Sequence, residues 1–260
     1  MDLGIFCKGT LDQEVVDHCF ASLFTLGKNP DPTYLDWLLK AWGWTLAVAG
    51  LGLLIALFLG AVMGTLRTLP PDSAWNRFLV RFSTAWVELF RNIPILVQVF
   101  LWYHVIPAFI PLLKGFPSYL LVSIAVGFFT SARIAEQVRA GIQSLPSGQK
   151  AAATALGLTT YQSYRYVILP MALRIVIPPL TSESMNLIKN SSVAFAVSVP
   201  ELTLFAMQAQ EETSRGVEIY LAVTILYALS AFAVNRVMAH IEKRTRIPGF
   251  IVANTEAAAH

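Results

Sequence analysis

The chain has 260 residues, of which 55% are hydrophobic and 13% are charged, and its mean hydropathy is +0.58. Soluble domains carry about 25% charged residues, so this composition excludes an ordinary soluble domain and is typical of a membrane protein. The net charge of +3 is small and the basic residues are dispersed between apolar runs, which does not favour nucleic-acid binding.

Segment 1–36 is mixed in character and rich in acidic residues, and no basic stretch leads into an apolar core. A cleavable signal peptide is therefore not expected. Both cysteines of the chain, Cys7 and Cys19, lie in it. Outside the cytoplasm they either form a disulfide or remain thiols, because spacing alone does not fix the geometry.

The first predicted membrane span is Ala41 to Leu66, about 26 residues without a charge, which is enough to cross a hydrocarbon core of about 30 Å. The following segment, Arg67 to Arg91, carries tryptophans and arginines and is predicted to lie at the membrane interface. Asn92 to Leu113, about 22 residues without Lys, Arg, Asp or Glu, is the predicted second span. Pro117 opens the third, which runs towards Arg139.

The fourth span is the most irregular. Val167 to Pro200 is apolar but is interrupted by charged residues and by Pro178 and Pro179, which predicts one broken helix or two short pieces. The fifth span has an uncharged core from Ile219 to Asn235. The sequence thus predicts an all-α membrane protein with about five transmembrane helices.

Lysines and arginines gather after the first, third and fifth spans. By the positive-inside rule, the N-terminus is predicted outside and the C-terminus inside. The predicted organisation is a periplasmic segment 1–36, a transmembrane domain 37–247 with a cytoplasmic loop at 146–166, and a cytoplasmic tail 248–260.

That loop belongs to the stretch GQKAAATALGLTTYQSYRYVILP, from Gly148 to Pro170. Its alanines favour a short helix, and Gly157 is a plausible helix stop. The stretch resembles the coupling loop of permease subunits in bacterial ABC importers, which reads EAA, three residues, Gly, nine residues, then I-x-L-P. Ala151 stands at the position of the Glu. An ordinary loop with a Gly-ended helix is the alternative. The resemblance implies these ATPase-coupling residues: Gly148, Gln149, Ala151, Ala152, Ala153, Leu156 and Gly157.

The third span contains TSARIAEQVRAGI, in which Thr130, Arg133 and Gln137 share one helical face. An ionisable group within a span is costly and usually faces a cavity or a partner. The stretch resembles A-Y-x-x-E-x-x-R of polar amino acid permeases, with Arg133 at the Tyr position. A guanidinium there suits a carboxylate substrate. The alternatives are an ion pair of Arg133 with Glu136, which is also close to Arg139, or snorkelling to the membrane surface.

Two further stretches carry polar groups. In SESMNLIKNSS, Asn186 and Lys189 are candidate substrate ligands, and the alternative is a polar helix interface in which Glu183 or another acid neutralises Lys189. WVELFRNIPILVQ resembles the E-x-x-R-x-x-P-x-L-x-Q segment of the same permeases. Its Glu88 and Arg91 are expected to pair as scaffold, with Gln98 a possible lining residue.

Catalytic chemistry has little support in the sequence. No G-x-x-x-x-G-K-[ST] loop occurs, and no histidines have metal-ligand spacing. The chain is therefore predicted to be no enzyme, to bind no metal and to hold no cofactor. ATP and Mg are expected on separate ATPase subunits.

Through ELFRNIP, SARIAEQVR and TSESMNLIKNSS the chain resembles a permease subunit of a glutamate/aspartate ABC importer. The resemblance implies a second, related permease subunit, two ATP-binding subunits and a periplasmic substrate-binding protein in a bacterial inner membrane. It also implies transport by alternating access. The alternatives are a secondary transporter driven by an ion gradient, which also uses broken helices and buried charge, and a purely structural membrane subunit.

Overall fold

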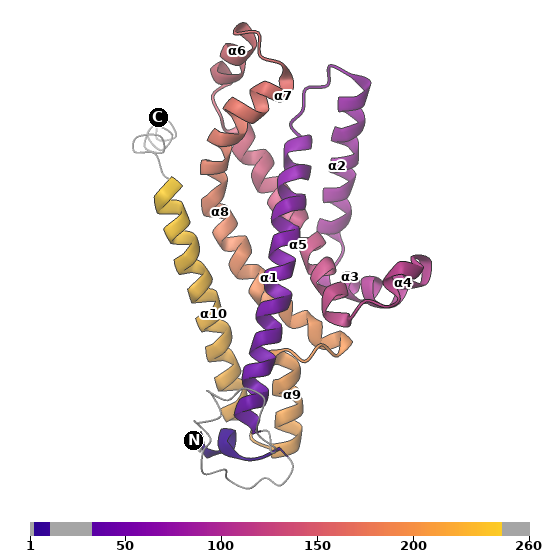
Figure 1. Ribbon diagram of the computed structural model, residues 1–260, viewed down its shortest axis with the longest axis vertical. Helices are drawn as coiled ribbons and strands as arrows, with labels where there is room; N and C mark the ends of the chain where they lie inside the picture. The colour runs from indigo at the N-terminus through magenta and orange to yellow at the C-terminus, as the bar shows by residue number, and fades with distance from the viewer. Residues whose placement is uncertain (1–2, 11–32, 246–260) are drawn as a thin grey trace.

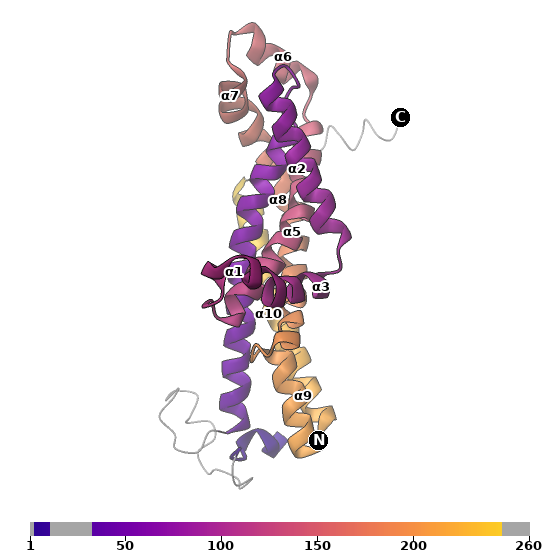
Figure 2. The ribbon, with the colours of Figure 1, turned by 90° about the vertical axis from the view of Figure 1, so that its right-hand side faces the viewer.

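A computed structural model describes residues 3–10 and 33–245, and over these residues the protein is all-α (Figure 1). Four helices are long and apolar enough to cross a membrane, or up to five if one bent pair counts as a span. This confirms the predicted class. Figures 1 and 2 show an elongated bundle with α6 and α7 at one end, here called the α6 end, and α9 at the other.

The elements follow one another in this order: η1 Leu3–Cys7, α1 Tyr34–Leu66, α2 Ala74–Asn92, α3 Ile95–Phe100, the π-helical turn η3 Leu101–Val105, α4 Ile106–Phe109, η4 Pro111–Leu113, α5 Ser118–Gln143, α6 Ser147–Ala155, α7 Thr160–Ser163, the π-helical turn η5 Tyr164–Ile168, α8 Leu169–Asn190, η6 Ser191–Val197, α9 Leu202–Thr213 and α10 Gly216–Thr245.

Helix α1 begins earlier than the uncharged run that predicted it. A capping box fixes its start: the Asp36 amide donates to Thr33 Oγ1, and the Thr33 amide donates to the Asp36 carboxylate at 3.1 Å. These bonds satisfy backbone donors that a helix start leaves unpaired. The helix therefore starts at Tyr34, ahead of the predicted domain boundary at 37, and it ends at Leu66 as predicted.

The predicted second span, Asn92 to Leu113, is not one straight helix. Ile93, which precedes Pro94, is extended (φ −93°, ψ 129°), as residues before proline prefer, and this separates α2 from α3. The axes of Ala74–Asn92 and Ile95–Phe109 differ by 107°, and α3 and α4 project sideways at mid-height (Figure 1). If this bent pair counts as the second span, that span includes α2, the helix expected at the interface.

The fourth span is less broken than predicted. Helix α8 is continuous through Pro178 and Pro179, although each proline removes one intrahelical hydrogen bond. Regular α-helix stops only after Asn190, where the 3₁₀-helix η6 follows. Both prolines adopt the helical φ that their rings favour, and such helices are tolerated in membranes where neighbouring groups compensate.

At the end opposite α6, a buried acid organises the chain. Glu201 is fully buried and caps α9 by accepting hydrogen bonds from the amides of Thr203 and Leu204. Its carboxylate also accepts a bond of 2.7 Å from the hydroxyl of Tyr227 on α10. Burial is the main cause of a raised pKa of Glu201. Helix α10 contains the predicted fifth span.

Two predictions concern residues outside the described part of the chain. The Cys7–Cys19 disulfide involves Cys19, and the cytoplasmic tail is segment 248–260. Both stay predictions.

The closest helix contact joins α1 to α5 through glycines. A Cβ added at Gly64 would lie 2.6 Å from the Ala135 carbonyl oxygen, and one at Gly60 would lie 2.5 Å from Ile134 Cγ2. Gly127 of α5 has the reciprocal position, where a Cβ would meet Ile55 Cβ at 2.8 Å. Small residues spaced four apart let membrane helices approach closely, so this pair forms the tightly packed centre of the bundle.

We predict that Gly64→Leu destabilises the protein by about 1–3 kcal/mol, because the new side chain overlaps the α5 backbone. The thermal midpoint of the detergent-purified protein measures the loss. Gly50→Leu is the matched control, since an added Cβ at Gly50 meets nothing within 4 Å. Equal midpoints for the two variants would contradict the close packing.

Candidate functional site

The face of α5 predicted to carry substrate ligands lies against a buried acid of α8. Arg133 Nε is 3.0 Å from Glu183 Oε2, and Gln137 Nε2 donates to Glu183 Oε1 at 3.1 Å. The Glu183 side chain is 7% exposed, whereas that of Arg133 is 41% exposed. A buried carboxylate is strongly destabilising unless it is paired, so Glu183 explains why a cation stands within this span.

We call Thr130, Arg133, Gln137 and Glu183 the Arg133 cluster. It retains unused hydrogen-bonding capacity: Thr130 Oγ1 and Gln137 Oε1 are buried without a partner. Among the described residues, Arg133 contacts a carboxylate only through Nε, and neither Nη group has a hydrogen bond. Buried polar atoms are rarely left unpaired, and such exceptions often mark a functional site.

The ion pair considered for Arg133, with Glu136, is wrong. The partner of Arg133 is Glu183 of α8 and not Glu136, which lies on its own helix. The suggestion that Glu183 neutralises Lys189 is wrong, since Lys189 is exposed and Glu183 is engaged by α5. Asn186 is half-buried one helical turn beyond Glu183. Asn186 therefore shares a side of α8 with the cluster, while Lys189 lies further along the helix.

Gln98 stabilises the bend between α2 and α3. It is fully buried, and its Nε2 donates to the carbonyl oxygens of Phe90 at 2.8 Å and Ile93 at 2.9 Å. These carbonyls lie at the end of α2, where the chain turns through the bend before Pro94. The side chain thus stabilises the bend, which agrees with the scaffold role expected for the surrounding motif.

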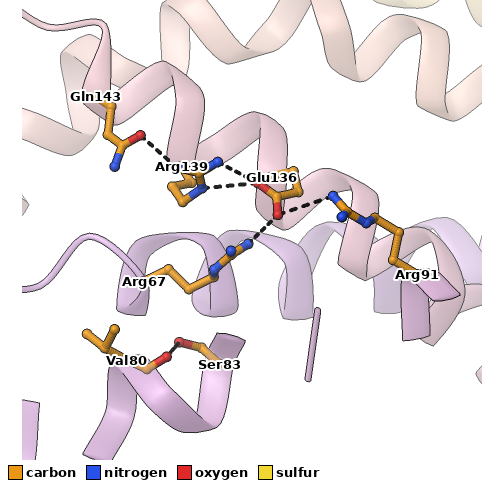
Figure 3. Close-up of polar contacts among 7 residues, drawn as sticks. All are labelled: Arg67, Val80, Ser83, Arg91, Glu136, Arg139 and Gln143. Atoms are coloured by element: carbon orange, nitrogen blue, oxygen red, sulfur yellow. Dashed lines mark hydrogen bonds and ion pairs between the residues drawn. The ribbon is translucent and has the colours of Figure 1, made fainter. Parts of the chain in front are cut away.

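A second polar centre surrounds Glu136 and joins three segments (Figure 3). Its carboxylate is 2.6 Å from Arg67 Nη1, 2.9 Å from Arg139 Nη2 and 3.5 Å from Arg91 Nη1. Arg67 directly follows α1, and Arg91 is in the last turn of α2. The side chains of Arg67 and Glu136 are 13% and 23% exposed, so water screens their attraction less than it would at the surface.

The expected contact of Glu136 with Arg139 is present, but the expected pair of Glu88 with Arg91 is not found in the described part of the chain. Arg91 faces Glu136, and Glu88 is exposed. An exposed ion pair gains little, whereas the partly buried Glu136 offers a stronger attraction. Arg67 was missed because its partner is far away in sequence.

The predicted coupling loop forms α6, a left-handed turn and α7. Gly157 has φ +75°, its amide donates to the Thr154 carbonyl, and the Leu158 amide donates to the Ala153 carbonyl. These two bonds are a Schellman motif and confirm Gly157 as the helix stop. A capping box of Thr159 and Gln162 then starts α7.

Most of the predicted coupling residues form an exposed surface. Leu156 is 81% exposed, and Gly148, Ala151, Ala152 and Gly157 are exposed as well. Gln149 is half-buried, and Ala153 is buried, so Ala153 packs within the protein and is not available to a partner. Leu156 is the large apolar side chain of this surface.

Comparison with known proteins agrees with this architecture. Residues 52–247 match the family described as binding-protein-dependent transport system inner membrane component. The chain is 41% identical over 227 residues to the glutamate/aspartate import permease protein GltJ of Escherichia coli (strain K12), covering 84% of this chain and 90% of GltJ. It is 32% identical over 190 residues to the probable amino-acid ABC transporter permease protein PatM of Vibrio harveyi, covering 73% and 83%.

A solved structure gives the same result for the fold. The crystal structure of an amino acid ABC transporter with histidines contains a chain that superposes with a TM-score of 0.69 at 25% identity. The match covers 89% of this chain and 100% of the other.

We predict that Glu136→Ala destabilises the protein by about 1–3 kcal/mol, because three guanidinium groups lose their common acceptor. The thermal midpoint of the purified protein should fall. Glu88→Ala, the same substitution at an exposed acid of α2, should leave it unchanged. If Glu88→Ala lowered the midpoint as much, the assignment of the structural centre to Glu136 would be wrong.

Proposed function

The chain belongs to the family of binding-protein-dependent transport system inner membrane components and is a permease subunit of an amino-acid ABC importer; from this premise we propose that its substrates are the acidic amino acids glutamate and aspartate. The observation that carries the proposal is the guanidinium of Arg133, whose Nε faces a buried acid while both Nη groups lack a hydrogen bond among the described residues. The name of GltJ supports the same substrates.

The chemistry of an acidic substrate fits this position. A guanidinium grips a carboxylate with two parallel hydrogen bonds, which the two Nη groups can donate. The unpaired oxygens of Thr130 and Gln137 are then available for the ammonium group or for other polar atoms of the substrate. Asn186, on the same side of α8 as Glu183, is the next candidate ligand.

Transport is proposed to proceed by alternating access in a larger assembly. In this assembly, two permease subunits bind two ATPases through their α6 segments, and a periplasmic binding protein delivers the substrate. ATP and Mg are held by the ATPases, and the exposed apolar surface around Leu156 supports α6 as their docking site. Family membership argues against the secondary transporter driven by an ion gradient.

Charge asymmetry supports the orientation within a bacterial inner membrane. The N-terminal segment 1–36 is proposed to be periplasmic, and the α6 end and the tail 248–260 are proposed to be cytoplasmic. The cytoplasmic position would bring α6 to the side where ATP is available.

We predict that Arg133→Gln lowers glutamate uptake by about 10- to 100-fold at limiting substrate, since a hydrogen bond to a charged group contributes about 1.5–3 kcal/mol. Uptake is measured in proteoliposomes that contain the assembled importer. Arg133→Lys keeps the charge but loses the two parallel donors of the guanidinium, so it should have an intermediate effect.

The matched control is Arg174→Gln, because Arg174 is exposed on α8 and has no ion pair among the described residues. It should transport normally. Wild-type uptake by a correctly assembled Arg133→Gln importer would refute the role of Arg133.

A separate prediction concerns coupling. Gly157→Val forces a β-branched residue into the left-handed region, which costs about 1–2 kcal/mol and disturbs the end of α6. We expect weaker ATPase binding and less transport per ATP hydrolysed, measured by co-purification and by coupled uptake. Gly115→Val, in the turn before α5 with open space around it, is the control and should have the smaller effect.

A further inference from the structure

An apolar cavity of about 1030 Å³ lies between α1, α5, α8 and the segment formed by α7 and η5. Leu57 and Ala61 line it from α1, Ile134 from α5, and Leu173 and Leu180 from α8. No member of the Arg133 cluster lines it. The cavity is therefore separate from the proposed substrate site.

The polarity of the lining changes along the cavity. Its lining residues on α1 run from Leu57 to Leu66, which is about 14 Å at the rise of an α-helix. Thr160 and Tyr161 belong to α7, which lies at the α6 end (Figure 1), Arg165 follows in η5, and Asn76 is in the first turn of α2. The remainder of the lining is almost entirely aliphatic, so the cavity is long, apolar and polar at one mouth.

Arg165 gives that mouth a positive charge. The side chain is exposed, its guanidinium carbon lies 5.9 Å from the centre of the Tyr166 ring, and no carboxylate pairs with it in the described ranges. Tyr161, which is 72% exposed, adds a hydroxyl nearby in sequence. A cation and hydroxyl groups together are suited to a phosphate group.

We propose that this cavity binds one phospholipid of the surrounding membrane. An acyl chain lies in the apolar part of the cavity, and the anionic phosphate lies at Arg165. The walls belong to spanning helices, so acyl chains surround them, and the α6 end lies where headgroups are expected. An acidic amino acid does not suit the apolar body, because its charged groups would lose water without gaining partners there. The proposal does not depend on the transported substrate.

The headgroup decides which phospholipid this site prefers. Lipid tails are as apolar as leucine side chains, so moving an acyl chain from the bilayer into the cavity gains little hydrophobic free energy. The charge of Arg165 therefore supplies a preference for anionic lipids. One basic residue near an anionic surface corresponds to about a fivefold preference.

The test uses the intact importer, purified in a mild detergent and relipidated with equal amounts of phosphatidylglycerol and phosphatidylcholine. Native mass spectrometry counts retained lipid for each permease subunit. We expect one lipid per copy of this chain, with phosphatidylglycerol preferred about fivefold. Ala61→Trp should fill the cavity and remove the lipid, while Val62→Trp, one residue away and not part of the lining, should retain it.

Arg165→Gln should keep a bound lipid but lose the preference, whereas Arg174→Gln should keep both. Because Arg165 is exposed, this variant tests the site even if Ala61→Trp fails to fold. Equal retention by Ala61→Trp and Val62→Trp would overturn the proposal. The proposal would also be overturned if the wild-type importer retained no lipid and Ala61→Trp blocked pairing of the permease subunits. These results would show that a helix of the second subunit fills the cavity.

Discussion

The pairing of Glu183 with α5 is the interaction on which the membrane domain depends. A carboxylate with 7% of its surface exposed cannot remain charged within a helix bundle unless cations or hydrogen-bond donors compensate it. Arg133 and Gln137 provide that compensation from a single face of α5. Any movement that separates α5 from α8 must break these contacts or replace them. A carboxylate substrate at Arg133 would therefore act on the contact that joins the two helices.

The rest of the bundle gives α5 a fixed position. On one side, glycines bring α1 within direct backbone contact of α5, and Glu136 ties α5 to the ends of α1 and α2. Closely packed interiors transmit displacement instead of absorbing it, so these three helices form one rigid unit. Towards the α6 end, α8 also packs closely on α5, since a Cβ added at Gly141 would overlap the Val176 side chain. The apolar cavity opens beside this contact, between α1, α5 and α8.

Much of this fold could be predicted from the sequence, because the bilayer imposes simple rules on length and charge. The uncharged runs predicted α1, α5 and α10, and Gly157 predicted the end of α6. The bend before Pro94 was not predicted, since the apolar run after it was long enough to pass for a span. Pro178 and Pro179 predicted a break that α8 does not have, because membrane surroundings tolerate prolines that would break a helix in water.

The shared helical face of the α5 residues in the Arg133 cluster could be predicted, but their partners could not. The spacing of Thr130, Arg133 and Gln137 places them on one helical face whatever the fold. That Arg133 meets Glu183, and that Arg67 and Arg91 meet Glu136, depends on contacts between helices far apart in sequence, which local spacing does not contain. Local i, i+3 reasoning found only the pair of Glu136 with Arg139.

The segment that contains α6, α7 and η5 connects α5 to α8. It joins the end of α5 to the start of α8, so both helices of the Arg133 cluster continue directly into it. Tyr164, in the turn before α8, also donates a hydrogen bond to the Thr68 carbonyl beyond α1. The segment from α6 to η5 is therefore tied to α5, to α8 and to the turn after α1. Ala151, the departure from the predicted coupling motif, is exposed on α6, so it changes the surface of this helix and leaves the packing of the segment intact.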